Sequence, residues 1–313
     1  MLFELAIADA YGASFEFTKP EFIKENNNLC YITHPSRPHE NIKKGYYTDD
    51  TQMSIAIARL MCSSVKPEHY NHIDFSDAFI TAFKRDPRKG YGKRIQTALE
   101  SNRCIHKYQD YTSFMIDLNP LVSTANGSVM RALPVGCLSD INLVKRTAVI
   151  QGTVTHQSIE AIESSIIASL AAHALWYRKC TKETLIDWLV LNRDNRPVPI
   201  RHRDDMTPVG CVAVDTIAAA ISLVVNGNSL TEIMHKAVSF GGDTDSVAAV
   251  AVGLASLADN VKKDLPLRLK RGLENTRFGK DHLRRLDSLM LKRFPRDKAV
   301  FNGEVKLGIW KGK

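Results

Sequence analysis

The chain has 313 residues, of which 44% are hydrophobic and 24% are charged, and it carries a formal net charge of +8. This length and apolar content are sufficient to bury a sizeable core. No run of about 18 apolar residues is present, which excludes a membrane-spanning helix, and Glu4 and Asp9 interrupt the apolar N-terminal segment that a secretion signal would need. We therefore predict a cytoplasmic protein with no membrane partner.

The cysteines and the basic residues do not point to zinc or to nucleic acid. The six cysteines are scattered, with no CxxC pair and no histidine at a zinc-finger spacing, which is typical of free thiols in a reducing compartment. Basic clusters lie at 84–94, 193–203 and 284–296, but they lack the interleaved aromatic residues of a single-strand binder. We interpret these clusters as solvated surface.

Helical periodicity dominates the chain and predicts an all-α protein. The expected helices, in chain order, cover 54–61, 75–83, 158–176, 214–225, 230–238 and 247–257. The first and last of these are apolar on nearly every side, which is typical of helices at the centre of a large bundle. The connections at 18–46, 101–123 and 192–209 are rich in proline, asparagine or charge and are predicted to lie on the surface.

The last part of the chain has a different pattern. Asn302 and Gly303 stand between two segments of alternating apolar residues, which is a strong signal for a β-hairpin. No linker or internal repeat divides the rest of the sequence. We therefore predict one domain over 1–313, with 297–313 as a small hairpin appendage.

Two similar acidic segments precede the two most apolar helices. Each offers two aspartates and hydroxyl side chains, from the residues Thr48, Asp49, Asp50, Asp243, Asp245 and Ser246. Helix capping is the simplest explanation, because such side chains accept hydrogen bonds from the first N–H groups of a helix. Capping needs only one side chain at each helix, however, and carboxylates crowded at the edge of an apolar core repel one another unless a cation neutralises them.

The donor set of these segments is made of oxygen atoms alone, which favours Mg²⁺ or Mn²⁺ over Zn²⁺. Four aspartates are enough for two such ions in one site. The helix N-termini are expected to keep the aspartates ionised and to offer N–H groups to phosphate. Metal binding and anion binding would then share one cleft.

Several segments in the same order resemble the motifs of the ADP-ribosylglycohydrolases. The resemblance includes the stretch from Asp9 to Gly12 with Glu16, and the stretch from Tyr47 to Met53. It continues through Gly90-Tyr91-Gly92, the stretch from Asn126 to Arg131, Thr155-His156, and the stretch from Gly241 to Ser246. Ser246 stands where the family often has threonine, and it keeps the hydroxyl group.

The resemblance implies an orthogonal multi-helix bundle with a dinuclear Mg²⁺ or Mn²⁺ site at the bottom of a cleft for ADP-ribose. It implies metal ligation by Thr48, Asp49, Asp50, Asp243, Asp245 and Ser246. Catalytic proton transfer is expected from Glu16 or Asp50, between which the sequence does not decide. Substrate contacts are expected from Glu16, Gly90, Tyr91, Gly92, Asn126, Gly127, Ser128, Met130, His156 and Gly242.

Simpler explanations exist for some of these residues. Residues 126–128 form a plain turn in one interpretation and a cradle for the diphosphate in the other. A single histidine such as His156 is commonly structural, and Gly90-Tyr91-Gly92 is either a phosphate loop or an exposed basic turn.

The activity implied by the resemblance is hydrolysis of the C1″ bond of ADP-ribose, with ADP-ribosyl-arginine on protein as the favoured substrate and a small ADP-ribosylated molecule as another. Two alternatives remain open. One is a hydrolase of ADP-ribosylated nucleic acid or of another N- or O-linked group, and the other is an inert ADP-ribose binder. We expect a monomer.

Overall fold

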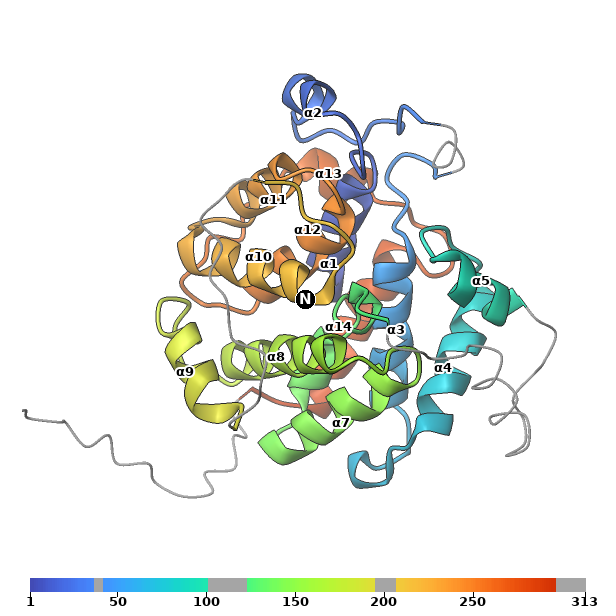
Figure 1. Cartoon of the computed structure of the whole chain (residues 1–313), viewed down its shortest axis with the longest axis vertical. Coiled ribbons are helices and arrows are strands. Elements are labelled where there is room, and N and C mark those ends of the chain that lie inside the picture. The colour runs from blue at the N-terminus through green and yellow to red at the C-terminus, as the bar shows by residue number, and fades with distance from the viewer. Residues whose placement is uncertain (37–41, 101–122, 195–206, 297–313) are drawn as a thin grey trace, which may run out of the picture.

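The computed structural model describes residues 1–36, 42–100, 123–194 and 207–296. Within these ranges the regular elements are helices, with three isolated β-bridges and no strand, so the predicted all-α class is confirmed (Figure 1). The predicted hairpin at 297–313 lies outside the described residues. The helices are α1 (Leu2–Gly12), α2 (Pro20–Asn26), α3 (Asp49–Met61), α4 (His72–Arg85), α5 (Lys93–Glu100), α7 (Ile141–Thr153), α8 (Ile159–Trp176), α9 (Leu185–Asn192), α10 (Ala213–Asn226), α11 (Leu230–Ser239), α12 (Thr244–Ala255), α13 (Leu267–Gly272) and α14 (Lys280–Arg293).

The six predicted helices correspond to α3, α4, α8, α10, α11 and α12, with ends that differ by a few residues. The segment 18–46, predicted to be an irregular surface connection, contains α2, which starts with proline at its first turn. The structure also adds α1 and α14. The first is apolar over most of its length and so has no amphipathic period. The second is amphipathic, with Leu283, Leu286 and Met290 buried and many charges on its exposed side, a pattern that was not recognised in the sequence.

The centre of the bundle is the pair α1 and α12, which pack against each other. Both are buried along almost their whole length. Gly12 allows the contact, since a Cβ at this position would lie 2.5 Å from the Cα of Asp245. The hydroxyl of Thr244 donates to the carbonyl of Gly12 over 2.8 Å and fixes the two helix ends together.

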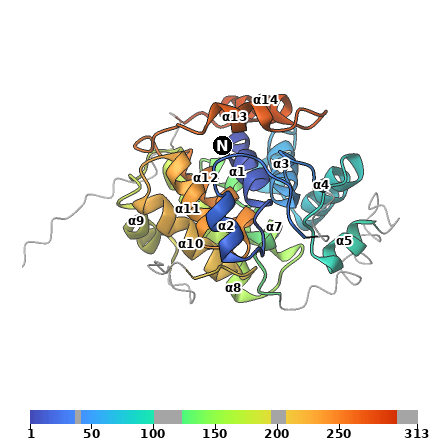
Figure 2. The ribbon, with the colours of Figure 1, turned by 90° about the horizontal axis from the view of Figure 1, so that it is seen from above.

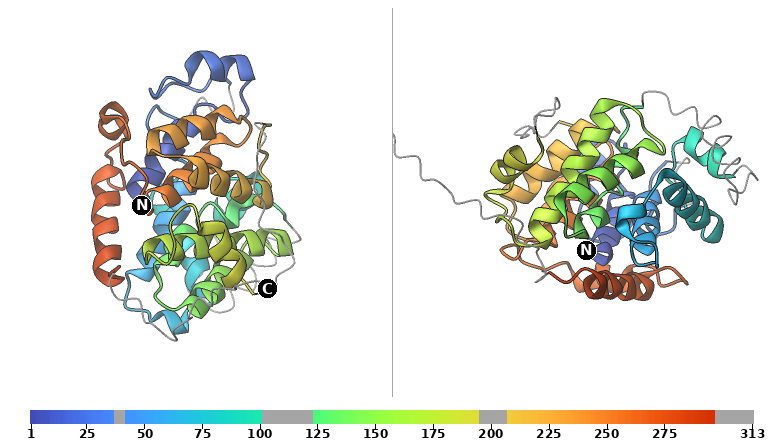
Figure 3. Two further views of the ribbon diagram at one scale, coloured as in Figure 1. Left: turned by 90° about the vertical axis from the view of Figure 1, so that its left-hand side faces the viewer. Right: turned by 90° about the horizontal axis from the view of Figure 1, so that it is seen from below.

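The other helices surround this pair. Helix α14 lies along one face of the bundle and α8 lies on the opposite face, as Figure 2 and both views of Figure 3 show. Helices α4 and α5 form one flank and α9 forms the other (Figure 1). Because α1 contacts both α3 and α12, the N-terminal ends of these two helices meet beside the C-terminal end of α1.

Arg88 is an exception to the prediction that the basic cluster 84–94 is solvated surface, since Lys84, Lys89, Lys93 and Arg94 are exposed. The Arg88 guanidinium is buried, lies 3.9 Å from the centroid of the Tyr47 ring, and forms an ion pair of 2.7 Å with Glu274. The side chain therefore joins the segment before α3 to the segment before α14. None of the helices in the described ranges has both the length and the hydropathy of a membrane span.

Candidate metal centre and cleft

The start of α3 is held by a side chain from another helix. The Asp9 carboxylate accepts from the backbone N–H of Thr48 at 3.0 and 3.1 Å and of Thr51 at 3.0 Å. It also accepts from the hydroxyl groups of Thr48 at 2.7 Å and Thr51 at 2.5 Å. Thr48 is the N-cap residue, yet its own side chain makes no capping hydrogen bond. Asp9 thus supplies the cap, and the capping role does not explain Asp49 or Asp50.

The start of α12 follows a tight turn at Gly241 and Gly242, whose φ angles are 73° and 78°. The N–H of Asp243 donates to the carbonyl of Val209 over 2.7 Å, and the amide of Asn126 donates to the Asp243 carboxylate over 2.9 Å. Asp243 is the N-cap residue of α12, but its side chain makes no capping hydrogen bond either. The geometry at both helices therefore leaves carboxylates that capping does not use.

These carboxylates converge. Carboxylate oxygens of Glu16, Asp243 and Asp245 lie within 4.8 Å of one another. Asp50 lies against the same group, and its Oδ1 atom is buried without a hydrogen-bond donor in the described part of the chain. Since a buried carboxylate oxygen without a partner is costly, this atom is best explained by a cation that binds it.

The pKa values of the acids in the cluster show how strongly the cluster disfavours further negative charge. Burial, followed by the charges of Asp243 and Asp9, raises the pKa of Glu16 to about 8. Burial also raises the pKa of Asp50 far above its usual range, with Asp49 as the next cause, and that of Asp245, with Glu16 as the next cause. The expectation that the helix N-termini keep the aspartates ionised is therefore wrong for Asp50 and Asp245 in the protein alone, because desolvation outweighs the helix dipole there.

The residues present fit a divalent cation. The donors are carboxylate and hydroxyl oxygens, one buried carboxylate oxygen has no donor, and the burial of several acids in one place requires neutralisation. The hydroxyl of Ser246 is hydrogen-bonded to Asp50, and the hydroxyl of Thr48 lies 3.3 Å from Asp50 Oδ2. Both hydroxyl groups thus adjoin the carboxylates that would share the ion.

A cleft of about 310 Å³ opens above this cluster, a size typical of small-molecule sites. Of the residues predicted from sequence, those that line it are Glu16, Asp49, Asp50, Gly90, Tyr91, Gly92, Asn126, Gly127, Met130, His156, Asp243, Asp245 and Ser246. Three predicted residues do not line it. The Thr48 hydroxyl is turned to Asp9, the Ser128 hydroxyl donates to the carbonyl of Ala161 over 3.0 Å, and Gly242 lines a neighbouring cavity of about 490 Å³.

The Gly90-Tyr91-Gly92 loop forms one wall of the cleft. Gly90 has a φ angle of 106°, and a Cβ there would lie 1.9 Å from Asp49 Oδ1, so this loop fixes the position of that carboxylate. Tyr91 is buried, donates to Gln52 Oε1 over 2.7 Å and packs edge-on against Phe83. Tyr91 is thus a buried part of this wall, whereas Gly90 and Gly92 on either side of it are exposed.

His156 also lines the cleft and is held by a chain of hydrogen bonds. Arg131 Nη2 donates to Thr155 Oγ1 over 2.7 Å, and this oxygen lies 2.7 Å from His156 Nδ1. Since no other acceptor for the Thr155 hydroxyl proton exists among the described residues, we assign that proton to the bond with Nδ1, which leaves the hydrogen on Nε2. Burial, together with Arg131 and Arg94, lowers the pKa of His156 to about 3, so the ring is a neutral donor.

Sequence reasoning missed five further residues of this region. Asp9 was part of a recognised motif but had no assigned role, and Arg131 likewise ended a motif without a function. Lys93 and Arg94 line the cleft although the basic cluster that contains them was interpreted as solvated surface. Cys211 also lines the cleft, and no signal in the sequence around it could have shown this.

Carboxyl groups gathered at the floor of a small-molecule cleft are the arrangement found in enzymes that cleave glycosidic bonds. The family comparison agrees with this class and makes it specific. The chain belongs to the ADP-ribosylglycohydrolase family, whose model matches residues 1–299. Family membership identifies a glycohydrolase that acts on ADP-ribosylated substrates.

Individual relatives are distant. ADP-ribosylhydrolase ARH3 of Bos taurus is 24% identical over 258 residues, covering 67% of this chain and 69% of that protein. The ARH3 of Homo sapiens is 23% identical over 259 residues, covering 67% and 70%. An uncharacterised protein of Archaeoglobus fulgidus is 24% identical over 291 residues, covering 88% and 90%.

A solved structure described as an ADP-ribosylglycohydrolase-related protein complex has the same fold. It aligns with a TM-score of 0.64 at 22% identity and covers 94% of this chain and 95% of its own. The predicted bundle of the ADP-ribosylglycohydrolase type is thereby confirmed.

Proposed function

We propose that this chain hydrolyses the C1″ bond between ADP-ribose and a modified group, with ADP-ribosyl-arginine on protein as the substrate and two Mg²⁺ or Mn²⁺ ions as cofactors. The observation that carries the proposal is the convergence of Glu16, Asp243 and Asp245 beside a buried oxygen of Asp50 that has no donor. Ionised carboxylates gathered in this way are stable at the floor of a cleft when bound positive charge offsets their repulsion, and without it burial raises their pKa values.

The residues that would hold the ions are Thr48, Asp49, Asp50, Asp243, Asp245 and Ser246. When bound, the ions would supply Lewis-acid activation of a water and of the ribose hydroxyl groups. Two of the six positions are restrained from outside the cluster, since Gly90 abuts Asp49 and Asn126 holds Asp243. Such restraint is what a preorganised metal site needs.

The other residues of the cleft have distinct proposed tasks. Lys93 and Arg94 at one wall offer positive charge to the diphosphate, and His156 offers an Nε2–H donor. Glu16 reaches both the acidic cluster and the cleft, so its carboxyl group is placed to accept a proton from water or to return one to the leaving group, with Asp50 as the alternative carrier.

The choice of arginine as the acceptor has a physical reason. An arginine leaving group is cationic, and the acidic floor of the cleft would attract it as the bond to C1″ breaks. A serine oxygen, a nucleobase or a terminal phosphate lacks that charge.

The experiment is a panel of ADP-ribosylated substrates with one defined linkage each, on arginine, serine, a nucleobase and a terminal phosphate, assayed with Mg²⁺ and with Mn²⁺. We expect release of ADP-ribose to be fastest from arginine and to stop when a chelator is added. Faster release from another linkage would contradict the acceptor and leave the hydrolase intact. Binding of ADP-ribose without release from any substrate would contradict the hydrolase and support an inert binder.

A further inference from the structure

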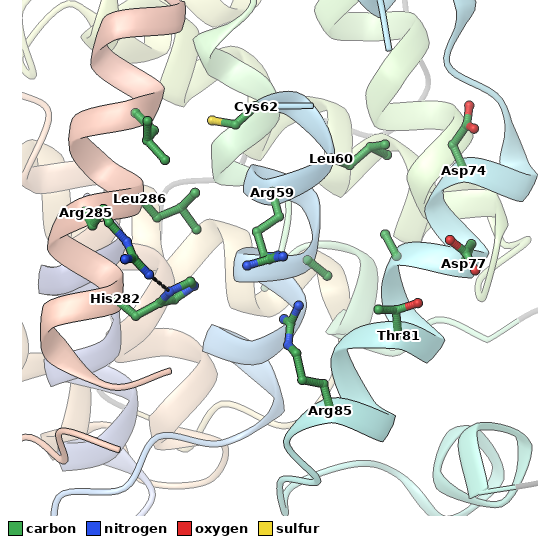
Figure 4. A pocket seen from close by; sticks show the side chains of 13 residues that line it. Arg59, Leu60, Cys62, Asp74, Asp77, Thr81, Arg85, His282, Arg285 and Leu286 are labelled. Carbon is green, nitrogen blue, oxygen red and sulfur yellow. Dashed lines mark hydrogen bonds between the residues drawn. The ribbon is translucent and has the colours of Figure 1, made fainter. Parts of the chain in front are cut away.

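A second cavity, of about 470 Å³, lies between α3, α4 and α14 and shares no lining residue with the cleft. Figure 4 shows that its basic side chains come from all three helices: Arg59 from α3, Arg85 from α4, and His282 and Arg285 from α14. Four nitrogen-bearing groups from three helices thus face one space. Nothing in the proposed hydrolysis uses them.

Two of these groups are hydrogen-bond donors without an acceptor. His282 is only 7% exposed, and its Nδ1 accepts from Arg285 Nη2 over 3.2 Å, so the hydrogen of the neutral ring is on Nε2. Nε2 of His282 and Nε of Arg85 are both buried with no hydrogen-bond partner. Buried donors of this kind cost free energy unless an acceptor reaches them.

The carboxylate that acts on Arg85 and His282 from outside the cavity is that of Asp86, which is already paired with Arg88 at 2.7 Å. Within the described ranges, none of Arg59, Arg85 and Arg285 forms an ion pair with a carboxylate. Arg85 stacks on the ring of Phe278, with 4.2 Å from its guanidinium carbon to the ring centroid, which covers one face of the group and leaves its N–H edge available.

Two acids line the α4 side of the cavity. Asp74 accepts from the N–H of Asn71 over 3.0 Å as part of the capping box of α4, so its carboxylate is already used. Asp77 is one turn further along the same helix, and Figure 4 shows both acids at the end of the cavity away from Arg85. The basic side chains therefore face a part of the cavity that holds no carboxylate.

The electrostatics agree with this geometry. Burial, followed by repulsion from Arg59 and Arg285, lowers the pKa of His282 to about 4. Burial and the charge of Arg59 also lower the pKa of Arg85. The Asp86 carboxylate acts on both groups in the opposite direction, and burial and the neighbouring arginines outweigh it.

We infer that this cavity is a binding site for a phosphate-bearing small molecule, distinct from the cleft. Guanidinium groups bind phosphate oxygens through charge-assisted, often bidentate hydrogen bonds, and the two unpartnered donors would complete the set. The remaining wall is apolar, formed by Leu60, Leu286 and Leu289, and suits the organic part of a phosphate ester. The site does not depend on the proposed hydrolysis.

The test is calorimetric titration of the full chain with inorganic phosphate. Arg59→Gln and Arg285→Gln each remove one charge from the cavity, and both residues are exposed enough for the fold to tolerate the change. We expect each to weaken binding about tenfold, since each removes charge-assisted hydrogen bonds. Melting temperatures of the variants check that they are folded.

One variant with the same change of charge is the control. Lys292→Gln lies on α14 outside the cavity. We expect it to bind phosphate within about twofold of the unaltered chain, since surface charges at a distance are screened. Unchanged binding in both Arg59→Gln and Arg285→Gln would place the phosphate elsewhere on the protein, and equal weakening by all three variants would mean unspecific attraction. Either result overturns the inference, as does the absence of binding.

A second measurement reports the position directly. The ¹⁵N resonance of His282 Nε2, identified by its loss in His282→Gln, should shift as phosphate is added. An unchanged resonance at saturating phosphate would overturn the inference.

Discussion

Asp9 offers the sharpest test of how the fold builds the site. Its carboxylate, on α1, accepts from two backbone N–H groups and two hydroxyl groups at the start of α3. Asp9→Ala removes the acceptor for all four. The first turn of α3 would then lose the restraint that holds Asp49 and Asp50 in place.

The magnitude follows from the donors that lose their partner. Two buried N–H groups, of Thr48 and Thr51, cost roughly 1–3 kcal/mol each when unsatisfied, about 2–6 kcal/mol together. Removal of a buried carboxyl group, whose pKa burial raises, offsets part of this cost. We expect Asp9→Ala to lower the free energy of unfolding by about 3 kcal/mol. Asp9→Asn keeps one acceptor oxygen and should lose about half as much.

The assay is urea denaturation at pH 7, with Asp187→Ala on the exposed side of α9 as the matched control. That control should change the free energy of unfolding by no more than about 0.5 kcal/mol, as surface substitutions do. If Asp9→Ala fell within the same range, the carboxylate would not be the cap of α3 and the reasoning would be refuted.

Three further changes have defined outcomes. The pKa of His156 is about 3 in the folded protein and near 6.5 in the unfolded chain, so the unfolded chain binds a proton first as the pH falls. The contribution of His156 to the free energy of unfolding is therefore complete above pH 6.5 and about 2 kcal/mol lower at pH 5. His156→Gln should remove that part of the loss between pH 7 and pH 5, and equal losses in both proteins would contradict the neutral ring. Gly90→Ala should push Asp49 aside and weaken Mn²⁺ binding about tenfold, whereas Gly92→Ala, whose Cβ would meet nothing within 4 Å, should not. Arg88→Met leaves the buried Glu274 carboxylate without its partner and should lower the free energy of unfolding, measured by urea denaturation, by about 3–5 kcal/mol. An unchanged free energy would show that the ion pair contributes nothing to stability.

The helical class and most of the cleft residues could be predicted because they depend on local patterns. Apolar runs such as 54–61 and 247–257 are visible in any window of the sequence, and glycines before acidic residues mark the turns that precede helices. The order of the motifs along the chain also allowed the family to be predicted. The residues 297–313, predicted as a hairpin, lie outside the described part of the chain.

What could not be predicted depends on contacts between distant segments. Asp9 caps a helix that begins about 40 residues later, and no local pattern shows this pairing. Arg88 is buried only because Tyr47 and Glu274 come to it in the folded chain. The balance between helix dipole and burial at Asp245 is likewise set by packing, since the dipole alone would have kept that carboxylate ionised.

The most direct test of the proposed metal-dependent hydrolase is a paired measurement on Asp245→Asn. This variant keeps the size of the side chain and removes one charge from the acidic cluster, and Asp187→Asn is the control at an exposed position. We predict that the variant loses calorimetric Mn²⁺ binding and ADP-ribose release together, while the control keeps both. Retention of metal-dependent release by Asp245→Asn at the rate of the control would contradict the account.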